Sequence, residues 1–254
     1  MRGLLSMAVL LACATPAVRA PGAEHKNPKG FSLTYPDGWL VATEEEQAAI
    51  RRAAEGTLPN LAPVDFSKVA AFIFDPEPDE FAPYINVVVT PGGGRVTEKL
   101  EQEYRRALSA NFGRLGLQPA GITTKRVEVG GRAALQAAYT LRFPGHPEPV
   151  RQKQVIVPTG NKTYTLTCCA PASSFAKYKP VFDRSILSFQ VEGGLFSEMP
   201  GAVRGGIIGA IVGGLVGVGI WLFRKLSATP QSPRSAFQEP SDPAALPGEG
   251  GASE

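Results

Sequence analysis

KRVEVGGRAALQAAYTLRF, residues 125–143, is the stretch that decides the fold. Two β-rich runs flank Gly130 and Gly131, and a Gly-Gly pair in that position is a two-residue hairpin signal. Apolar and polar residues alternate in the second run, which indicates one apolar and one polar strand face. The apolar face comprises Leu135, Ala137, Tyr139, Leu141 and Phe143. The stretch therefore predicts an antiparallel hairpin with one face on a core.

Similar signals lie on both sides of this hairpin. Residues 151–157 and 163–169 flank PTGNK and predict a second hairpin, in which Tyr164, Leu166 and Cys168 share a face. Four shorter β-rich runs come earlier in the chain, and the turn residues Pro36, Asp37 and Gly38 separate the first two. These runs are 30–35, 39–43, 69–74 and 85–90.

Three helices are expected between and after the strands. Thr43 is placed to cap a helix over 44–55, and the three glutamates at 44–46 suit a solvated first turn better than a metal site. Thr97 opens the strongest helix, and Gly113 and Gly116 offer stops for it. Its apolar stripe comprises Leu100, Tyr104, Leu108, Phe112 and Leu115. The last helix covers 174–189, and Pro180 is expected to interrupt it.

This order of elements predicts the fold class. Runs of strands joined by short turns pair antiparallel, and the helices cover the sheet. We therefore expect an α+β domain over 24–191, with an antiparallel sheet covered by helices.

The first twenty residues resemble a secretory signal peptide. Arg2 precedes a short apolar stretch, and residues 18–20 suit cleavage after Ala20. The alternative is a lipoprotein signal, because Leu10 to Cys13 resembles a lipobox with Cys13 as the lipidated residue. We expect ordinary cleavage and keep lipidation at Cys13 open.

Residues 204–225 predict a transmembrane helix. The nineteen residues from Gly205 to Phe223 carry no charge and would span about 28 Å as a helix. Arg224 and Lys225 follow, so the positive-inside rule places the C-terminus in the cytoplasm and the domain outside the cell membrane. A linker over 192–203 joins the domain to this span. The remainder, 226–254, is rich in Pro, Ser, Gly and Ala and is expected to be disordered.

Glycines recur every fourth residue within the span. On a helix they would form a flat stripe that lets two helices approach closely, which favours self-association. The alternative is that a glycine-rich span has this spacing by chance. The stripe consists of Gly205, Gly209, Gly213 and Gly217.

Signals for chemistry are sparse. His25 and His146 have no visible ligand or catalytic partner, and no nucleophile motif or P-loop is present. The charge of +3 is scattered, which argues against nucleic-acid binding. Cys168 and Cys169 are expected to be free thiols, at least one of them buried. We expect no enzyme activity, no cofactor and no structural metal.

Three local features remain open. The acidic loop over 75–80 is a weak candidate for a cation. The glycines at 92–94 precede a helix, where they could hold an anion or serve as a flexible connector. Asn161 begins a glycosylation sequon that a hairpin turn explains equally well.

Three segments resemble the PsbP-like superfamily, including the DcrB-like bacterial envelope proteins. They are GFSLTYPDGW at 30–39, VEVGGRAALQAAYTL at 127–141 and YTLTCCAPASSFAKYKPVFDRSILSF at 164–189, and the resemblance covers residues 28 to 191. It implies an accessory, binding or assembly role without a shared catalytic set. DcrB-like proteins are anchored at the N-terminus, whereas this chain has its predicted span at the C-terminus.

We therefore favour a non-catalytic envelope protein that binds an unknown protein partner or a ligand near the membrane. The alternatives are a ligand- or ion-binding accessory subunit of a transport system and an enzyme of unrecognised type. A large apolar pocket or an acidic cluster would favour the accessory subunit. A buried titratable pair in a cleft would favour the enzyme.

Overall fold

The structure, a computed structural model, describes residues 22–57, 66–78, 81–143 and 146–192. In chain order the elements are β1 (Gly22–Asn27), β2 (Phe31–Pro36), β3 (Leu40–Val41), α1 (Glu44–Thr57), the 3₁₀ helix η2 (Phe66–Lys68), β4 (Val69–Phe74), β5 (Tyr84–Pro91), α2 (Glu98–Arg114), β6 (Ala120–Val129), β7 (Arg132–Leu141), β8 (Val150–Pro158), β9 (Lys162–Pro171), α3 (Phe175–Ser188) and β10 (Gln190–Val191).

The centre of the fold is a seven-stranded antiparallel sheet in the order β3-β4-β5-β9-β8-β7-β6. Both predicted hairpins are present. Val129 pairs with Arg132 to close the first, and Gly130 and Gly131 have φ of 56° and 72°. Positive φ at both turn positions is what a type I′ turn requires, so this Gly-Gly pair sets the register.

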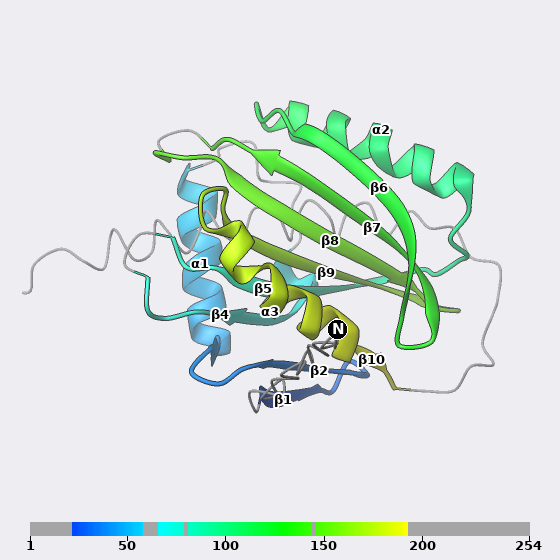
Figure 1. Ribbon diagram of the computed structural model, residues 1–254, viewed down its shortest axis with the longest axis horizontal. Coiled ribbons are helices and arrows are strands. Elements are labelled where there is room, and N and C mark those ends of the chain that lie inside the picture. Colours follow the sequence, from blue (N-terminus) through cyan, green and yellow to red (C-terminus); the bar gives the residue numbers. More distant parts are fainter. Residues whose placement is uncertain (1–21, 58–65, 79–80, 144–145, 193–254) are drawn as a thin grey trace, which may run out of the picture.

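Helices cover both faces of the sheet (Figure 1). On one face the apolar stripe of α2 packs against β7 and β8, and α1 adds Ile50 to the same core. On the other face α3 crosses the sheet, and its buried side chains meet those of β2, β8 and β9. Both faces are therefore dry in the middle of the sheet, and the α+β class is confirmed.

The helix starts follow the expected capping rules. Thr43 Oγ1 accepts a hydrogen bond from the Glu46 amide at 3.2 Å, and Glu46 Oε2 accepts one from the Thr43 amide at 2.7 Å. This reciprocal pair is a capping box. Thr97 caps α2 by accepting from the Leu100 amide at 3.2 Å. One expected stop is wrong, because Gly113 lies inside α2, and Gly116, with φ of 71°, follows its end.

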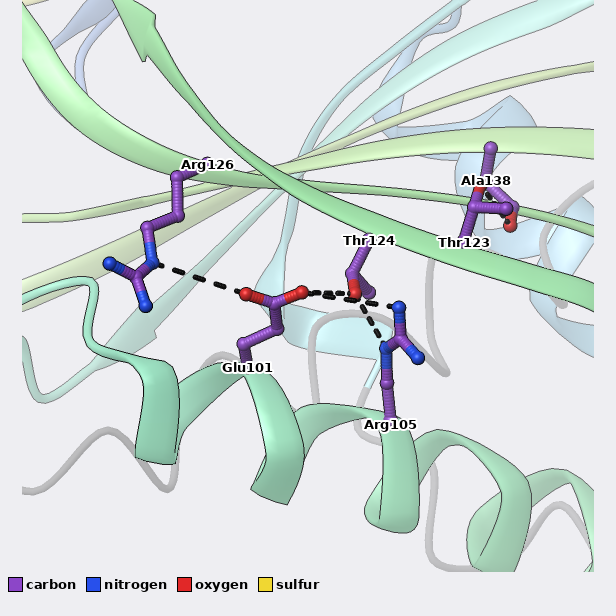
Figure 2. Close-up of polar contacts among 6 residues, drawn as sticks. All are labelled: Glu101, Arg105, Thr123, Thr124, Arg126 and Ala138. Carbon is purple, nitrogen blue, oxygen red and sulfur yellow. Dashed lines mark hydrogen bonds and ion pairs between the residues drawn. The ribbon is translucent and has the colours of Figure 1, made fainter.

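Figure 2 shows how α2 is tied to the edge strand β6. Thr124 donates a hydrogen bond to Glu101, and Arg105 Nε donates to Thr124 Oγ1 at 2.6 Å. Glu101 also lies 4.0 Å from Arg105 Nη2 and 4.0 Å from Arg126 Nε. Glu101 and Arg105, an i, i+4 pair on α2, are therefore part of a network that fixes the helix on the sheet.

A second, small sheet was not expected. Its order is β1-β2-β10, so β2 pairs with a strand near each end of the described chain. The run after the 36–38 turn forms only β3, which pairs with β4 in the large sheet. Trp39 instead enters the α3 core, where its ring lies 6.3 Å from those of Tyr178 and Phe182.

Pro180 does not interrupt the last helix. α3 is continuous from Phe175 to Ser188, and Pro180 lies on its exposed side. The carbonyl that proline leaves without a helical donor belongs to Ala176, which is also exposed. Water can satisfy that carbonyl, whereas a break would separate Tyr178 and Phe182 from the core they share with Ile186.

The predicted signal peptide at 1–20, with Cys13, lies outside the described residues. So do the linker after Glu192, the predicted span at 204–225 with Gly205, Gly209, Gly213 and Gly217, and the tail. Within the part of the chain that the structure describes, no helix is both long enough and apolar enough to cross a membrane.

Candidate functional site

A groove of about 570 Å³ runs between α3 and strands β6–β8, on the sheet face that α3 covers. We call it the α3 groove. Its lining combines small or apolar side chains with charged ones, from the strands as well as from α3. The lining residues are Lys125, Val127, Glu128, Val129, Gln136, Ala138, Arg151, Lys153, Ala172, Phe175, Ala176, Lys179, Asp183, Ile186 and Leu187.

The basic residues of the groove come from three elements. Arg151 and Lys153 are two residues apart on β8, so both point to the same sheet face. Lys125 comes from β6 and Lys179 from α3. The groove thus brings four cations together from positions up to 54 residues apart in the sequence, against the carboxylates of Glu128 and Asp183.

Asp183 is held between two of these lysines. It accepts a hydrogen bond from Lys153 and one from Lys179 Nζ at 2.6 Å. Burial by itself would raise the pKa of Asp183, but the hydrogen bonds and charges of Lys153 and Lys179 outweigh that effect and hold it below its ordinary value. Asp183 is therefore a carboxylate at neutral pH and fixes Lys153, whose side chain is only 14% exposed.

Arg151 is positioned differently. Its guanidinium lies 5.2 Å from the centre of the Phe175 ring, which belongs to the first turn of α3. This cation–π contact orients the side chain along the groove. Leu187, near the other end of α3, is 69% exposed. The groove therefore offers an oriented cation, a second exposed cation at Lys125 and an uncovered aliphatic side chain.

This set of groups is suited to binding rather than to proton transfer. A titratable pair, Lys153 and Asp183, does lie in a cleft, but the lowered pKa of the carboxyl favours a stable ion pair, not a group poised to exchange protons at neutral pH. Within the described residues, no three His, Cys, Asp or Glu side chains lie close enough to hold a metal ion. Cations beside apolar side chains suit an anionic group attached to an apolar body.

Two further hollows contain fewer charged groups. One of about 630 Å³ lies between β2 and the outer side of α3, with Asp37 and Arg184 as its charged residues. The other, of about 290 Å³, contains His146, whose Nδ1 lies 2.5 Å from the Glu148 carbonyl and whose ring meets Phe81 edge-on. These contacts of His146 are structural.

The other predicted features have structural roles in the described residues. Asp75, at the start of the acidic loop, is buried; it accepts hydrogen bonds from the Glu77 amide at 3.1 Å and from the Tyr178 hydroxyl at 3.0 Å. Cys168 and Cys169 are free and buried, as predicted. Burial raises the pKa of both thiols, that of Cys169 to about 12.

The glycines at 92–94 are neither a flexible connector nor an anion cradle. The Gly92 amide donates to the Asn161 carbonyl at 2.9 Å, and the Gly94 amide donates to the Thr159 carbonyl at 3.1 Å. The amides of Gly92 and Gly94 are therefore hydrogen-bonded to the β8–β9 turn, and the bond from Gly92 fixes the position of Asn161.

The α3 groove was not predicted from the sequence. Two local signals were available, since Lys179 and Asp183 are an i, i+4 pair and Arg151 and Lys153 share a strand face. Nothing in the sequence shows that these two pairs meet, because Lys153 and Asp183 are 30 residues apart.

Comparison with known proteins finds similarity at the level of structure only. No known protein family and no curated protein matches the sequence. Among solved structures, cyanobacterial PsbP (CyanoP) from Synechocystis is 14% identical, with a TM-score of 0.49, over 71% of this chain and 98% of that one. LpqN of Mycobacterium tuberculosis, described as involved in cell envelope biogenesis, is 16% identical, with a TM-score of 0.40, over 68% of this chain and 86% of that one.

At these identities the likeness concerns fold alone. A PsbP protein is thus among the structures that this chain resembles, and the more specific DcrB-like resemblance stays a prediction.

Proposed function

We propose that this chain is a membrane-anchored, non-catalytic protein of the cell envelope whose domain binds an acidic segment of a protein partner in the α3 groove. The observation that carries the proposal is the groove itself, which combines four basic side chains with apolar ones. The predicted signal peptide and C-terminal span supply the location.

The open shape of the groove favours a chain segment over an enclosed small molecule. It lies along the side of α3, with Ala172 near one end of the helix and Leu187 near the other. A segment lying there would place acidic groups near Arg151 and Lys125 and apolar groups on Val127 and Leu187. Lys153 and Lys179 already share Asp183, so Arg151 and Lys125 are expected to contribute most.

The expected energies are modest, because the binding charges are exposed. An exposed ion pair contributes about 0.2–1 kcal/mol, so removing one cation should weaken binding up to about fivefold. Steering by the combined charge should speed association, and that effect should fall with added salt.

Site-specific photo-crosslinking in the native membrane tests the proposal. A photoreactive residue replaces Ala176, which lies in the groove, or Arg106, which is exposed on α2 across the sheet. We expect a protein adduct from position 176 only. The adduct should be lost in the Arg151→Glu, Lys125→Glu double variant and retained in Arg106→Glu, provided that all variants reach the membrane equally.

A purified probe separates this proposal from its alternatives. The full chain in detergent should bind a fluorescent peptide of alternating Glu and Leu and not its Lys and Leu counterpart, with weaker binding at high salt. Equal binding of both peptides, or an adduct that survives the double charge reversal, would rule out the groove as an acidic-segment site. A small-molecule adduct at position 176 would instead favour the transport-accessory alternative.

A further inference from the structure

The end of the domain from which the chain leaves toward its predicted membrane span is basic, and we infer that this end docks on anionic phospholipid headgroups. This inference rests on the membrane anchor in the proposed function. We call this surface the basic end. It consists of Lys29, Lys68, Arg95, Arg132 and Lys162, each of which lies in or directly beside a different connection of the fold.

Strand register brings these connections to one end of the sheet. Pro91, at the end of β5, pairs with Lys162, at the start of β9, and Pro158 pairs with Thr163. The first residue of β4, Val69, pairs with Val88 near that end of β5. The loops that enter or leave these strands therefore lie together, at the side of Figure 1 where β10 ends.

Side-chain contacts join the basic residues across these connections. Lys162 Nζ donates to the Lys29 carbonyl at 3.2 Å, and Lys29 Nζ donates to the Ser67 carbonyl at 3.3 Å, next to Lys68. Arg95 directly follows Gly94, whose amide is bonded to the β8–β9 turn. The Lys162 ammonium group has three N–H donors, so beside its bond to the Lys29 carbonyl it can donate to a phosphate.

The chain leaves the described domain at this same end. The Glu192 amide donates to the Gly30 carbonyl at 2.9 Å, immediately after Lys29. The β6–β7 turn before Arg132 is also close, since a Cβ on Gly130 would lie 2.7 Å from the Phe189 carbonyl oxygen. Eleven residues, 193–203, separate this exit from Arg204, and they can extend at most about 40 Å. The basic end is thus tethered closest to the lipid surface.

The charge distribution favours one orientation. At the basic end five cations outnumber the acidic neighbours Glu98, Glu128 and Glu192. At the opposite end the carboxylates Asp75, Glu77 and Glu148 are matched by the exposed cations Arg114, Arg142 and Lys177. An anionic surface would therefore attract the first end more strongly than the second, by about fivefold in the docking equilibrium for each net cation near the headgroups.

Fluorescence quenching in vesicles tests the inference. The full chain is reconstituted into phosphatidylcholine alone or into equal parts of phosphatidylcholine and phosphatidylglycerol, with a headgroup-attached quencher in both. A fluorophore is placed at Asn161→Cys, an exposed position in the β8–β9 turn, or at Ser173→Cys, exposed at the opposite end. Cys168 and Cys169 are buried, which limits background labelling of the domain.

We expect several-fold stronger quenching at position 161 in the anionic vesicles, decreasing with salt because surface charge is screened beyond about 8–10 Å at physiological ionic strength. Arg95→Glu with Lys162→Gln should remove that difference, and Arg114→Glu, at the far end of α2, should leave it unchanged. Equal quenching at position 161 in both kinds of vesicle, or quenching at position 173 equal to that at position 161, would overturn the inference. Circular dichroism shows whether each variant is folded.

The two proposals fail in different ways. Extraction of the vesicles at alkaline pH after the fluorescence measurement reports the anchor, because a membrane-spanning chain stays with the lipid. Release of the chain would refute the anchor, whereas the quenching measured before extraction still decides docking.

Discussion

Replacing Gly93 with alanine should destabilise the domain strongly, although alanine is usually tolerated in place of glycine. Gly93 is buried between β5 and α2, and its φ is not in the positive region that favours glycine. A Cβ at this position would lie 1.6 Å from the Thr159 carbonyl oxygen and 2.9 Å from the carbonyl carbon of Gly160. The obstacle is therefore backbone, which cannot rotate away as a side chain could.

The size of the effect follows from these contacts. Real Cβ atoms essentially never come closer than 3.0 Å to another heavy atom, so the two segments must separate by at least 1.4 Å (3.0 minus 1.6). That separation breaks the bonds from the Gly92 and Gly94 amides, now 2.9 and 3.1 Å long. Gly92 and Gly94 are only half-buried, so each of the two bonds lost costs about 0.5–1.5 kcal/mol, and the overpacking a further 1–3 kcal/mol. We expect a loss of about 2–6 kcal/mol in the free energy of unfolding.

Urea unfolding followed by tryptophan fluorescence measures this loss. The chain has two tryptophans, so a Trp221→Phe background leaves Trp39, which is buried against α3, as the reporter. Gly113→Ala is the matched control, because a Cβ at Gly113 would meet nothing within 4 Å and the residue lies inside α2. That variant should gain about 0.5–1 kcal/mol. If Gly93→Ala unfolds within about 0.5 kcal/mol of the parent, the close approach of these segments is refuted.

Four further outcomes are expected. Tyr104→Phe removes the hydrogen bond from the Tyr104 hydroxyl to the side-chain oxygen of Gln154 on β8, and this loss should cost about 1–3 kcal/mol in urea unfolding. An unchanged free energy of unfolding would mean that the bond is absent. The pKa of Asp183 is lowered, so the carboxylate stabilises the fold at pH values above the ordinary pKa of 3.8, and this contribution is lost as the pH falls further. The free energies of unfolding of the parent and Asp183→Asn should therefore converge in acid, and a constant difference between them would contradict this. Cys168 and Cys169 should resist maleimide in the folded chain and react once urea unfolds it, as mass spectrometry can show. Gly209→Leu should reduce self-association in a membrane crosslinking assay at equal insertion, and unchanged association would make the glycine stripe merely compositional.

Local patterns determined most of the elements. The Gly130–Gly131 turn, the Thr97 cap and the stripe from Leu100 to Phe112 each act within a few residues, so their sequence is sufficient to specify them. A strand pair joined by a two-residue turn and a helix with one apolar face need no distant information. The antiparallel sheet covered by helices could therefore be expected before the structure was known.

Contacts between distant segments decided the rest. The sequence of β9 placed Tyr164, Leu166 and Cys168 on one face, but it did not show that Thr163, Thr165 and Thr167 on the other face are buried too, because α2 covers that face while α3 covers the first. Burial of a strand face depends on what packs over it, and the sequence of the strand alone does not specify this.

The α3 groove and the basic end have the same origin. Lys153 meets Asp183 only because α3 packs on β8, and Lys29 meets Lys162 only because the β1–β2 turn lies beside the start of β9; the partners are 30 and 133 positions apart in the sequence. The sequence of a single segment predicts that a charged side chain is solvated, because its neighbours in the chain point to the opposite face of the strand or to other sides of the helix. Its function is set by the charges that the tertiary fold gathers around it, and electrostatic attraction acts through space rather than along the chain.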